Sequence, residues 1–333
     1  MGVMKNLNLL LVLLLSTFHV IGCSKSELTD QPINPLPERA NFKVIGYLFA
    51  QDDLLALSTK IDYTKITHLN VAFINPDSSG VFAAVPNLKE LVQKAHANNV
   101  KVISAFAGGN PPPYLKDLLK PAKRKVLIDG LMSLIQTYEL DGIDVDLEGD
   151  FVNQDYEAFV VELSGRLKAQ KKMMTAAVAT WNSAAYSDKA LALFDLINIM
   201  SYDQTGPWRK DKPGPHSTFE AVLVDFNHWN KDRGLPSEKL ILGLPFYGYG
   251  FGSDIRSDIT YGELVSGYPG AEKVDLIELA GKGTFYYNGM PTIQKKVAYA
   301  IENKMGGVMI WHITADAAGP FSLLNLISTE INK

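Results

Sequence analysis

Three acidic residues alternate with apolar residues in one short segment, residues 141–148, which reads DGIDVDLE. Successive side chains of a β-strand point to opposite faces, so Asp144, Asp146 and Glu148 would share one face, about 6.6 Å apart along the strand. Ionising all three inside a protein would cost Coulomb repulsion, which raises the pKa of at least one of them. The pattern therefore predicts an active site that keeps a carboxylic acid protonated near neutral pH.

Two other interpretations of the acidic segment are a calcium loop and a charged surface strand. An EF-hand loop needs glycine at its sixth position, where this segment has Asp146. The apolar spacers Ile143, Val145 and Leu147 do not suit a solvated face. A divalent metal held by the carboxylates stays open as a less favoured alternative. The sequence has no His/Cys cluster with ligand spacing, so we predict neither a metal nor another cofactor.

Eight apolar segments rich in Val, Ile and Phe recur along the chain, with amphipathic helical stretches between most of them. Such segments are typical of buried parallel strands, and the alternation predicts a single (β/α)8 TIM barrel. Glu148 would then end the fourth strand at the C-terminal rim, where barrel enzymes have their active sites. The strands are expected at Phe42–Phe49, Ile66–Phe73, Lys101–Ala107, Gly142–Glu148, Met173–Thr180, Leu196–Tyr202, Leu240–Phe246 and Gly307–His312.

An open doubly wound sheet is the alternative architecture, but the sequence has no GxGxxG turn and no P-loop to indicate a nucleotide fold. The stretch Phe251–Met290 is longer than a normal connection from a strand to a helix. It contains two strand-like pieces, Val274–Leu279 and Gly283–Tyr287. We expect it to form a small insertion after the seventh strand, not a second domain.

The amino-terminal residues are expected to direct export and to lie outside the barrel. The apolar run over residues 7–20 fits the hydrophobic region of a signal peptide and is short for a membrane span. It leads into VIGC, which resembles the bacterial lipobox and would make Cys23 the lipidated residue. An ordinary signal peptide with an incidental cysteine is the alternative. Ser24 follows in place of Asp, which favours the outer membrane in a host with two membranes.

These features predict a lipoprotein signal peptide over residues 1–22, a lipidated linker over 23–40 and a catalytic barrel over 41–333. The expected location is a bacterial envelope, with membrane attachment only through the lipid. The formal net charge is −4 and Lys and Arg form no basic stripe, so nucleic acid is not an expected partner. We expect a monomer.

The acidic segment resembles the DGxDxDxE signature of family 18 glycoside hydrolases, the chitinase family. Three later segments resemble motifs of the same family in the same order. They are MxYD at residues 200–203, which continues into GPW, LPxYG at 244–248 and GGxMxW at 306–311. Tyr47 and Phe73 match the first two strands more loosely, and the resemblance covers about residues 42–331.

The sequence departs from the family pattern at two places. Phe106 stands where the family usually has the serine of SxGG, with Ser104 two residues earlier, so the hydrogen-bond partner of Asp144 is left open. Tyr249 replaces an arginine that is common after the strand-seven motif.

The resemblance implies a substrate-assisted, retaining mechanism. Glu148 would protonate the glycosidic oxygen and later activate water, while the N-acetyl oxygen of the substrate attacks the anomeric carbon. Asp146 would hold the acetamido N–H, Asp144 would tune Asp146, and Tyr202 would donate to the acetamido oxygen. Trp181 could be a sugar platform or a packing residue. The implied substrate-binding residues are Asp203, Met200, Trp311, Trp208, Tyr47 and Phe73.

The expected activity is cleavage of β-1,4 linkages between N-acetylglucosamine units in chitin or chito-oligosaccharides. An endo-β-N-acetylglucosaminidase acting on N-glycans is one alternative, although the GPW continuation favours the chitinase branch. A non-catalytic glycan-binding lipoprotein is another, and the presence of Glu148 argues against it. A metal-dependent hydrolase barrel is the remote third alternative.

Overall fold

The computed structural model describes residues 41–50 and 53–333. The predicted signal peptide, the lipidation site at Cys23 and the linker lie outside the described residues. No helix in the described part of the chain combines the length and apolar character needed to cross a membrane.

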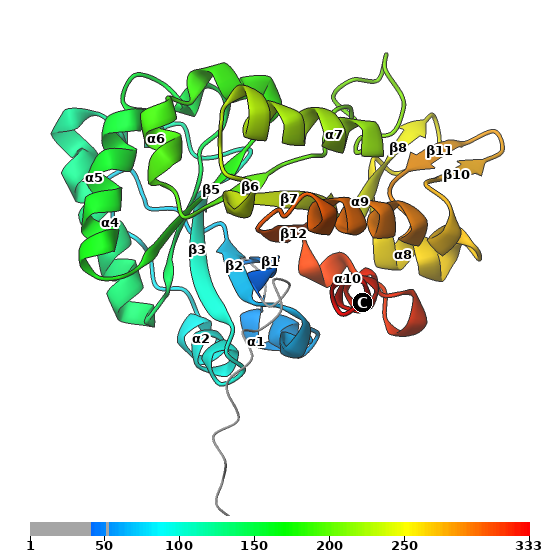
Figure 1. The fold of residues 1–333 in the computed structure, drawn as a ribbon, viewed down its shortest axis with the longest axis horizontal. Helices are drawn as coiled ribbons and strands as arrows, with labels where there is room; N and C mark the ends of the chain where they lie inside the picture. Colours follow the sequence, from blue (N-terminus) through cyan, green and yellow to red (C-terminus); the bar gives the residue numbers. More distant parts are fainter. Residues whose placement is uncertain (1–40, 51–52) are drawn as a thin grey trace, which may run out of the picture. The chain divides into compact units, whose positions relative to one another are not determined.

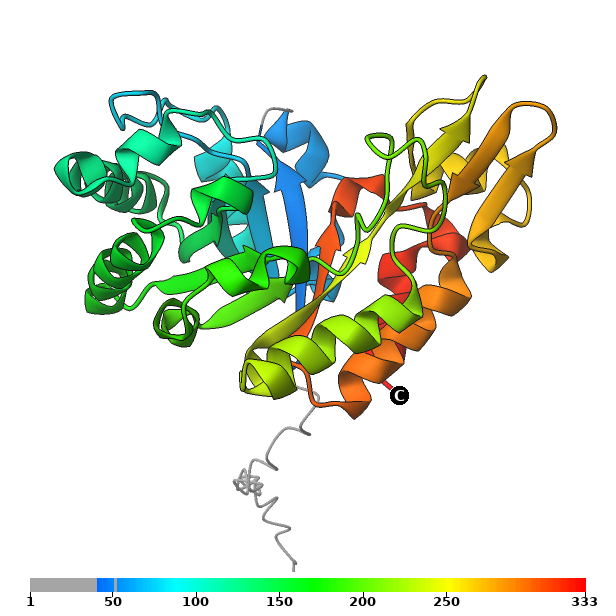
Figure 2. The same ribbon diagram turned by 90° about the horizontal axis from the view of Figure 1, so that it is seen from above.

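Eight parallel strands close into a barrel in the order β1-β12-β7-β6-β5-β4-β3-β2, which confirms the predicted fold (Figures 1 and 2). The observed bounds lie within a few residues of the predicted ones. β1 and β3 end at the predicted residue, and the other six strands end one to three residues earlier. They are β1 (Lys43–Phe49), β2 (His68–Ala72), β3 (Lys101–Ala107), β4 (Gly142–Asp146), β5 (Met173–Val178), β6 (Leu196–Ile199), β7 (Leu240–Pro245) and β12 (Gly307–Trp311).

Helices pack around the outside of the barrel, and those that follow β1 and β5 are short. Outside the insertion they are α1 (Leu54–Ser58), α2 (Leu88–His96), α3 (Leu115–Leu118), α4 (Pro121–Tyr138), α5 (Tyr156–Ala169), α6 (Asp188–Leu193), α7 (Phe219–Asn227), α9 (Met290–Glu302) and α10 (Leu323–Ile331).

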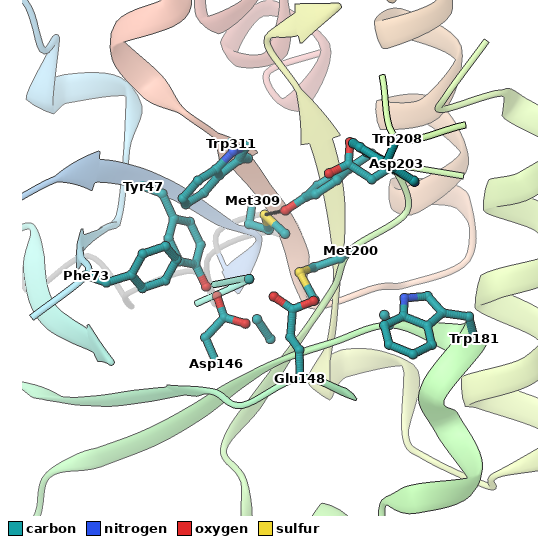
Figure 3. Close-up of a pocket in the computed structure, with 14 residues that line it drawn as sticks. Tyr47, Phe73, Asp146, Glu148, Trp181, Met200, Asp203, Trp208, Met309 and Trp311 are labelled. Atoms are coloured by element: carbon teal, nitrogen blue, oxygen red, sulfur yellow. Dashed lines mark hydrogen bonds between the residues drawn. The ribbon is translucent and has the colours of Figure 1, made fainter. Parts of the chain in front are cut away.

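Strand alternation separates two packed layers. Ile143, Val145 and Leu147 are fully buried in the large apolar layer between barrel and helices. Asp144 and Asp146 lie on the opposite, inner face of β4, as the period of two predicts. Asp144 accepts a hydrogen bond from Tyr47 of β1, and Asp146 lines the pocket at the barrel mouth (Figure 3). A smaller apolar cluster fills the inside of the barrel around them: Ile45, Tyr47, Ala72, Ala105, Leu196, Ile241 and Met309.

The insertion after β7 is a four-stranded antiparallel sheet in the order β10-β11-β8-β9, with one helix. Its elements are β8 (Tyr247–Gly252), β9 (Asp258–Thr260), α8 (Tyr261–Gly267), β10 (Leu276–Leu279) and β11 (Gly283–Tyr286). The last two strands were predicted, but the insertion begins at Tyr247, four residues before the predicted start. The alternating glycines of β8 hid this strand, because glycine is depleted in strands. They are required by close packing, since a Cβ on Gly250 would lie 2.1 Å from the Arg256 carbonyl oxygen.

Candidate active site

A pocket of about 450 Å³ opens at the C-terminal ends of the barrel strands, around the end of β4 (Figure 3). It brings together every predicted site residue of the barrel except Asp144, which lies beneath it. Sequence segments from β1 to β12 contribute, so the pocket exists only in the closed barrel. Its lining is Tyr47, Phe73, Gly109, Asp146, Glu148, Ala177, Ala179, Trp181, Met200, Tyr202, Asp203, Trp208, Met309 and Trp311.

Asp144 is fully buried and accepts hydrogen bonds from three other strands. The Tyr47 hydroxyl donates to it at 2.7 Å, the Asn198 amide donates at 3.2 Å, and the Thr175 hydroxyl also donates. Burial raises the pKa of Asp144, and these donors oppose the rise because they stabilise the carboxylate. The partners that the sequence left open are therefore on β1, β5 and β6.

Strand β3 supplies no polar support to Asp144. Phe106, at the position where the family has serine, points outward and its ring centroid lies 5.7 Å from that of Phe159. Ala105 is the β3 residue in register with Asp144. The Ser104 hydroxyl is buried and has no hydrogen-bond partner among the described residues.

Asp146 is 4% exposed and lies between the other two acids. Burial, followed by the charges of Glu148 and Asp144, raises its pKa well above the usual range. No described group donates a hydrogen bond to its buried Oδ1. The carboxyl group therefore favours a protonated state unless a bound partner stabilises its charge.

Glu148 follows β4 and reaches into the open part of the pocket (Figure 3). Burial, and to a lesser degree the charge of Asp203, raises its pKa to about 7. A Cβ on Gly109 would lie 3.4 Å from a Glu148 carboxylate oxygen, so this glycine lets the backbone pass close to the acid. An acid with this pKa holds its proton at neutral pH and can still release it, as a general acid must.

Tyr202 and Asp203 follow β6 and line the same pocket as Glu148. The Tyr202 hydroxyl lies 3.8 Å from the Met309 sulfur. Gly243 on β7 makes room for this ring, because a Cβ there would lie 2.9 Å from Tyr202 Cε1. Burial, followed by the charge of Asp203, raises the pKa of Tyr202 well above its usual range, so the hydroxyl remains a hydrogen-bond donor.

The carboxylate of Asp203 is held by aromatic neighbours that the sequence analysis did not single out as site residues. The Tyr247 hydroxyl donates to Oδ1, and the Tyr249 hydroxyl donates to the same oxygen at 3.0 Å. His216 contacts the backbone of the same residue, because its Nδ1 accepts from the Asp203 N–H at 3.4 Å. Tyr249, at the position of the family's common arginine, thus contacts Asp203 through a neutral donor.

Aromatic rings form two groups on opposite sides of the carboxylates (Figure 3). Phe73 stacks on Trp311 with ring centroids 5.5 Å apart, and Tyr47 meets Trp311 edge-on at 5.6 Å. On the other side Trp181 and Trp208 are 74% and 60% exposed. Exposure of two large rings beside a pocket suits stacking on sugar faces better than packing within the loops.

Several supporting residues were missed by the sequence analysis. Asn198 gave a usable signal, because an amide interrupts the apolar run of β6. Thr175 gave none, since threonine is common in strands. His216 and Tyr247 lie in loops or in the insertion, where neither periodicity nor spacing indicates a contact with Asp203.

Activity is predicted to fall as the pH rises above about 7. The proton on Glu148 is needed for donation, and its pKa is raised to about 7 by burial and by Asp203. We expect the alkaline limb of kcat/KM to have an apparent pKa near 7 in wild type and a lower one in Asp203→Asn, since removing that charge stabilises ionised Glu148. Rate profiles from pH 4 to 10 measure this. An unchanged limb in Asp203→Asn would contradict the electrostatic coupling.

Comparison with known proteins agrees with this geometry. A family model described as "Glycosyl hydrolases family 18" matches residues 43–316. A chitinase structure from the chitin utilization locus of Flavobacterium johnsoniae is 37% identical, with a TM-score of 0.80, over 87% of this chain and 94% of that one. A chitinase structure from Bacteroides thetaiotaomicron is 29% identical, with a TM-score of 0.77, over 87% of this chain and 96% of that one.

Curated sequences give more distant matches. A probable endochitinase of Caenorhabditis elegans is 29% identical over 59% of this chain, but the match spans only 40% of the length of that relative. Because the family match covers most of the barrel, the chain belongs to glycosyl hydrolase family 18. Among the described residues no group of three or more His, Cys, Asp or Glu side chains is arranged to hold a metal ion.

Proposed function

We propose that this chain hydrolyses β-1,4 linkages between N-acetylglucosamine units, with Glu148 as the general acid and base. The observation that carries the proposal is the acidic series of β4, which ends in a carboxylic acid of raised pKa inside an aromatic-lined pocket. Membership of glycosyl hydrolase family 18 and the chitinase names of its relatives support the same activity.

The proposed reaction begins with proton transfer from Glu148 to the glycosidic oxygen. The acetamido oxygen of the sugar attacks the anomeric carbon as the leaving group departs, which gives an oxazolinium ion and ionised Glu148. Glu148 then takes a proton from water, the water attacks the same carbon, and the sugar keeps its β configuration. Two displacements at one carbon account for the retained configuration.

Two neighbouring side chains are proposed to hold the acetamido group during these steps. The Tyr202 hydroxyl donates to the acetamido oxygen, and Asp146 accepts from the acetamido N–H. The buried Asp146 Oδ1, which has no donor among the described residues, is suited to accept that hydrogen bond. Once ionised, Asp146 would also stabilise the positive charge of the intermediate. Trp311 would form the apolar floor beneath the sugar, flanked by Phe73 and Tyr47. Met200 lines the pocket beside Glu148 (Figure 3).

An N-glycan endo-glycosidase remains the alternative within the family. The exposed rings of Trp181 and Trp208 favour a linear chain of similar sugars, because each ring offers a flat face to a successive pyranose. The discriminating experiment compares chito-oligosaccharides with a high-mannose glycoprotein at equal enzyme concentration. Rapid release of short oligomers from the first substrate alone supports the chitinase proposal. Preferential release of whole glycans from the second would replace it.

We further propose that the protein is an exported lipoprotein anchored through Cys23, by the sequence argument given above. Cys23→Ala should abolish lipidation and change processing, because the thiol is the site of acyl attachment. Mass spectrometry and detergent partitioning of the mature protein measure both, with Ser24→Ala as the matched control. The same mass and partitioning in wild type and Cys23→Ala would contradict the anchor.

A further inference from the structure

One lysine of the outer helices is completely buried. Lys296, on α9, is 0% exposed, and burial lowers its pKa to about 7. Its ammonium group contacts neutral oxygens of Ser217 and Asn288. The charges of Asp275, Asp225 and Glu220 act on it without a direct contact among the described residues. Burying a cation without a direct counter-ion costs folding free energy. Hydrogen bonds from the ammonium group must offset that cost.

The ammonium group donates three hydrogen bonds, all to Ser217 and Asn288. It donates to the Ser217 carbonyl oxygen at 2.8 Å, to the Ser217 hydroxyl at 2.7 Å and to the Asn288 side-chain oxygen at 2.7 Å. The Asn288 amide in turn donates to the Ser217 carbonyl at 2.9 Å. Ser217 is thereby fixed from α9 and from the end of the insertion.

Ser217 and His216 are hydrogen-bonded to residues 201–204, the segment that contains Tyr202, the residue proposed to bind the acetamido oxygen. The Ser217 hydroxyl donates to the Ser201 carbonyl oxygen at 2.6 Å, directly before Tyr202. The Gln204 N–H donates to the His216 carbonyl at 3.1 Å. The Asp203 N–H is directed at His216 Nδ1 at 3.4 Å.

This segment needs such support because its backbone is strained. Asp203 has a φ of +61°, in the left-handed region that non-glycine residues rarely adopt. Backbone strain of this kind persists only where surrounding contacts enforce it. The 216–217 segment provides those contacts, and Lys296 holds the 216–217 segment.

We propose that Lys296 is a positioning residue that acts through Ser217 on residues 201–204, and so holds Tyr202 and Asp203 in the geometry required by the bound sugar. This inference rests on the proposed glycosidase function. Lys296 itself touches neither the pocket nor the substrate, so its effect must pass through the Ser217 hydrogen bonds.

The test measures chito-oligosaccharide hydrolysis by Lys296→Met and Ser217→Ala. Each has a matched control: Lys168→Met changes an exposed lysine on α5, and Ser266→Ala removes an exposed hydroxyl on α8. We expect kcat to fall at least ~10-fold in both test variants, with KM changed less than ~3-fold, since misplacing a group by a fraction of an ångström affects the transition state most. The controls should match wild type.

A second comparison separates positioning from general stabilisation. In a Tyr202→Phe background the hydroxyl to be positioned is absent, so Ser217→Ala should then cost much less in kcat than it does in wild type. An equal fold loss in both backgrounds would overturn the proposal, as would wild-type kcat in a folded Ser217→Ala variant. If Lys296→Met does not fold, Ser217→Ala decides alone.

A crystal structure of Ser217→Ala gives a readout that does not depend on turnover. We expect the Tyr202 hydroxyl and the Asp203 backbone to shift from their wild-type positions, and unshifted atoms would overturn the inference. Inactivity of wild type on every N-acetylglucosamine oligomer would instead refute the proposed function, so the two failures are distinguishable.

Discussion

Glu148→Gln is expected to reduce hydrolysis of chito-oligosaccharides by ~10²–10⁴, the range for loss of general acid–base catalysis. The amide keeps the shape of the side chain but has no proton to transfer to the leaving oxygen. Binding should survive, because the aromatic rings and Asp203 are unchanged. Single-turnover rates and calorimetric titration with the same oligomer measure the two effects separately, with exposed Glu139→Gln as the matched control.

The same variant should also change how the free energy of unfolding depends on pH. Measuring this change shows at the same time that the variant folds. The pKa of Glu148 is raised from 4.5 to about 7 in the folded protein, so its ionised form costs stability as the pH rises through this interval. A neutral amide avoids that cost. Glu148→Gln should therefore be more stable than wild type at pH 8, by on the order of 3 kcal/mol, and equally stable near pH 4. Near-normal turnover in this folded variant would refute the assignment of Glu148.

Asp146→Asn is expected to cost ~10²–10³ in kcat, although Asp146 forms no covalent bond with sugar in the proposed reaction. The amide has no negative charge to place beside the oxazolinium ion. The amide oxygen can still accept from the acetamido N–H, so the expected loss reports the missing charge. Asp150→Asn makes the same chemical change on an exposed side chain near the end of β4 and should be neutral.

If the acetamido group of the substrate is the nucleophile, removing that group from the substrate should abolish cleavage. Fully deacetylated chitosan lacks the nucleophile and should not be cut, while a thiazoline analogue of the intermediate should inhibit tightly. Product anomers can be followed by NMR, and the β anomer should appear first. Rapid cleavage of the deacetylated polymer, or initial release of the α anomer, would contradict the mechanism, and so would wild-type kcat in Asp146→Asn.

The sequence alone determined the features that depend on local periodicity. Because a strand alternates its faces every second residue, the spacing of Asp144, Asp146 and Glu148 placed the acids together, with their apolar spacers on the helix side. The same periodicity located the eight barrel strands. Glycine-rich β8 was missed because its glycines follow from backbone packing against neighbouring strands, which no local pattern reveals.

The tertiary structure decided which side chains support the acids. Tyr47 is 97 residues before Asp144 in the chain, yet its hydroxyl lies 2.7 Å from that carboxylate because the barrel closes β1 onto the opposite side of the interior. The strand register put Ala105, not a serine, beside Asp144. Lys296 and Ser217 are 79 residues apart in the chain. They meet only because α9 packs against α7 and the loop that precedes it. Such contacts depend on how the barrel closes and how its helices dock, and these are properties of the whole packed chain.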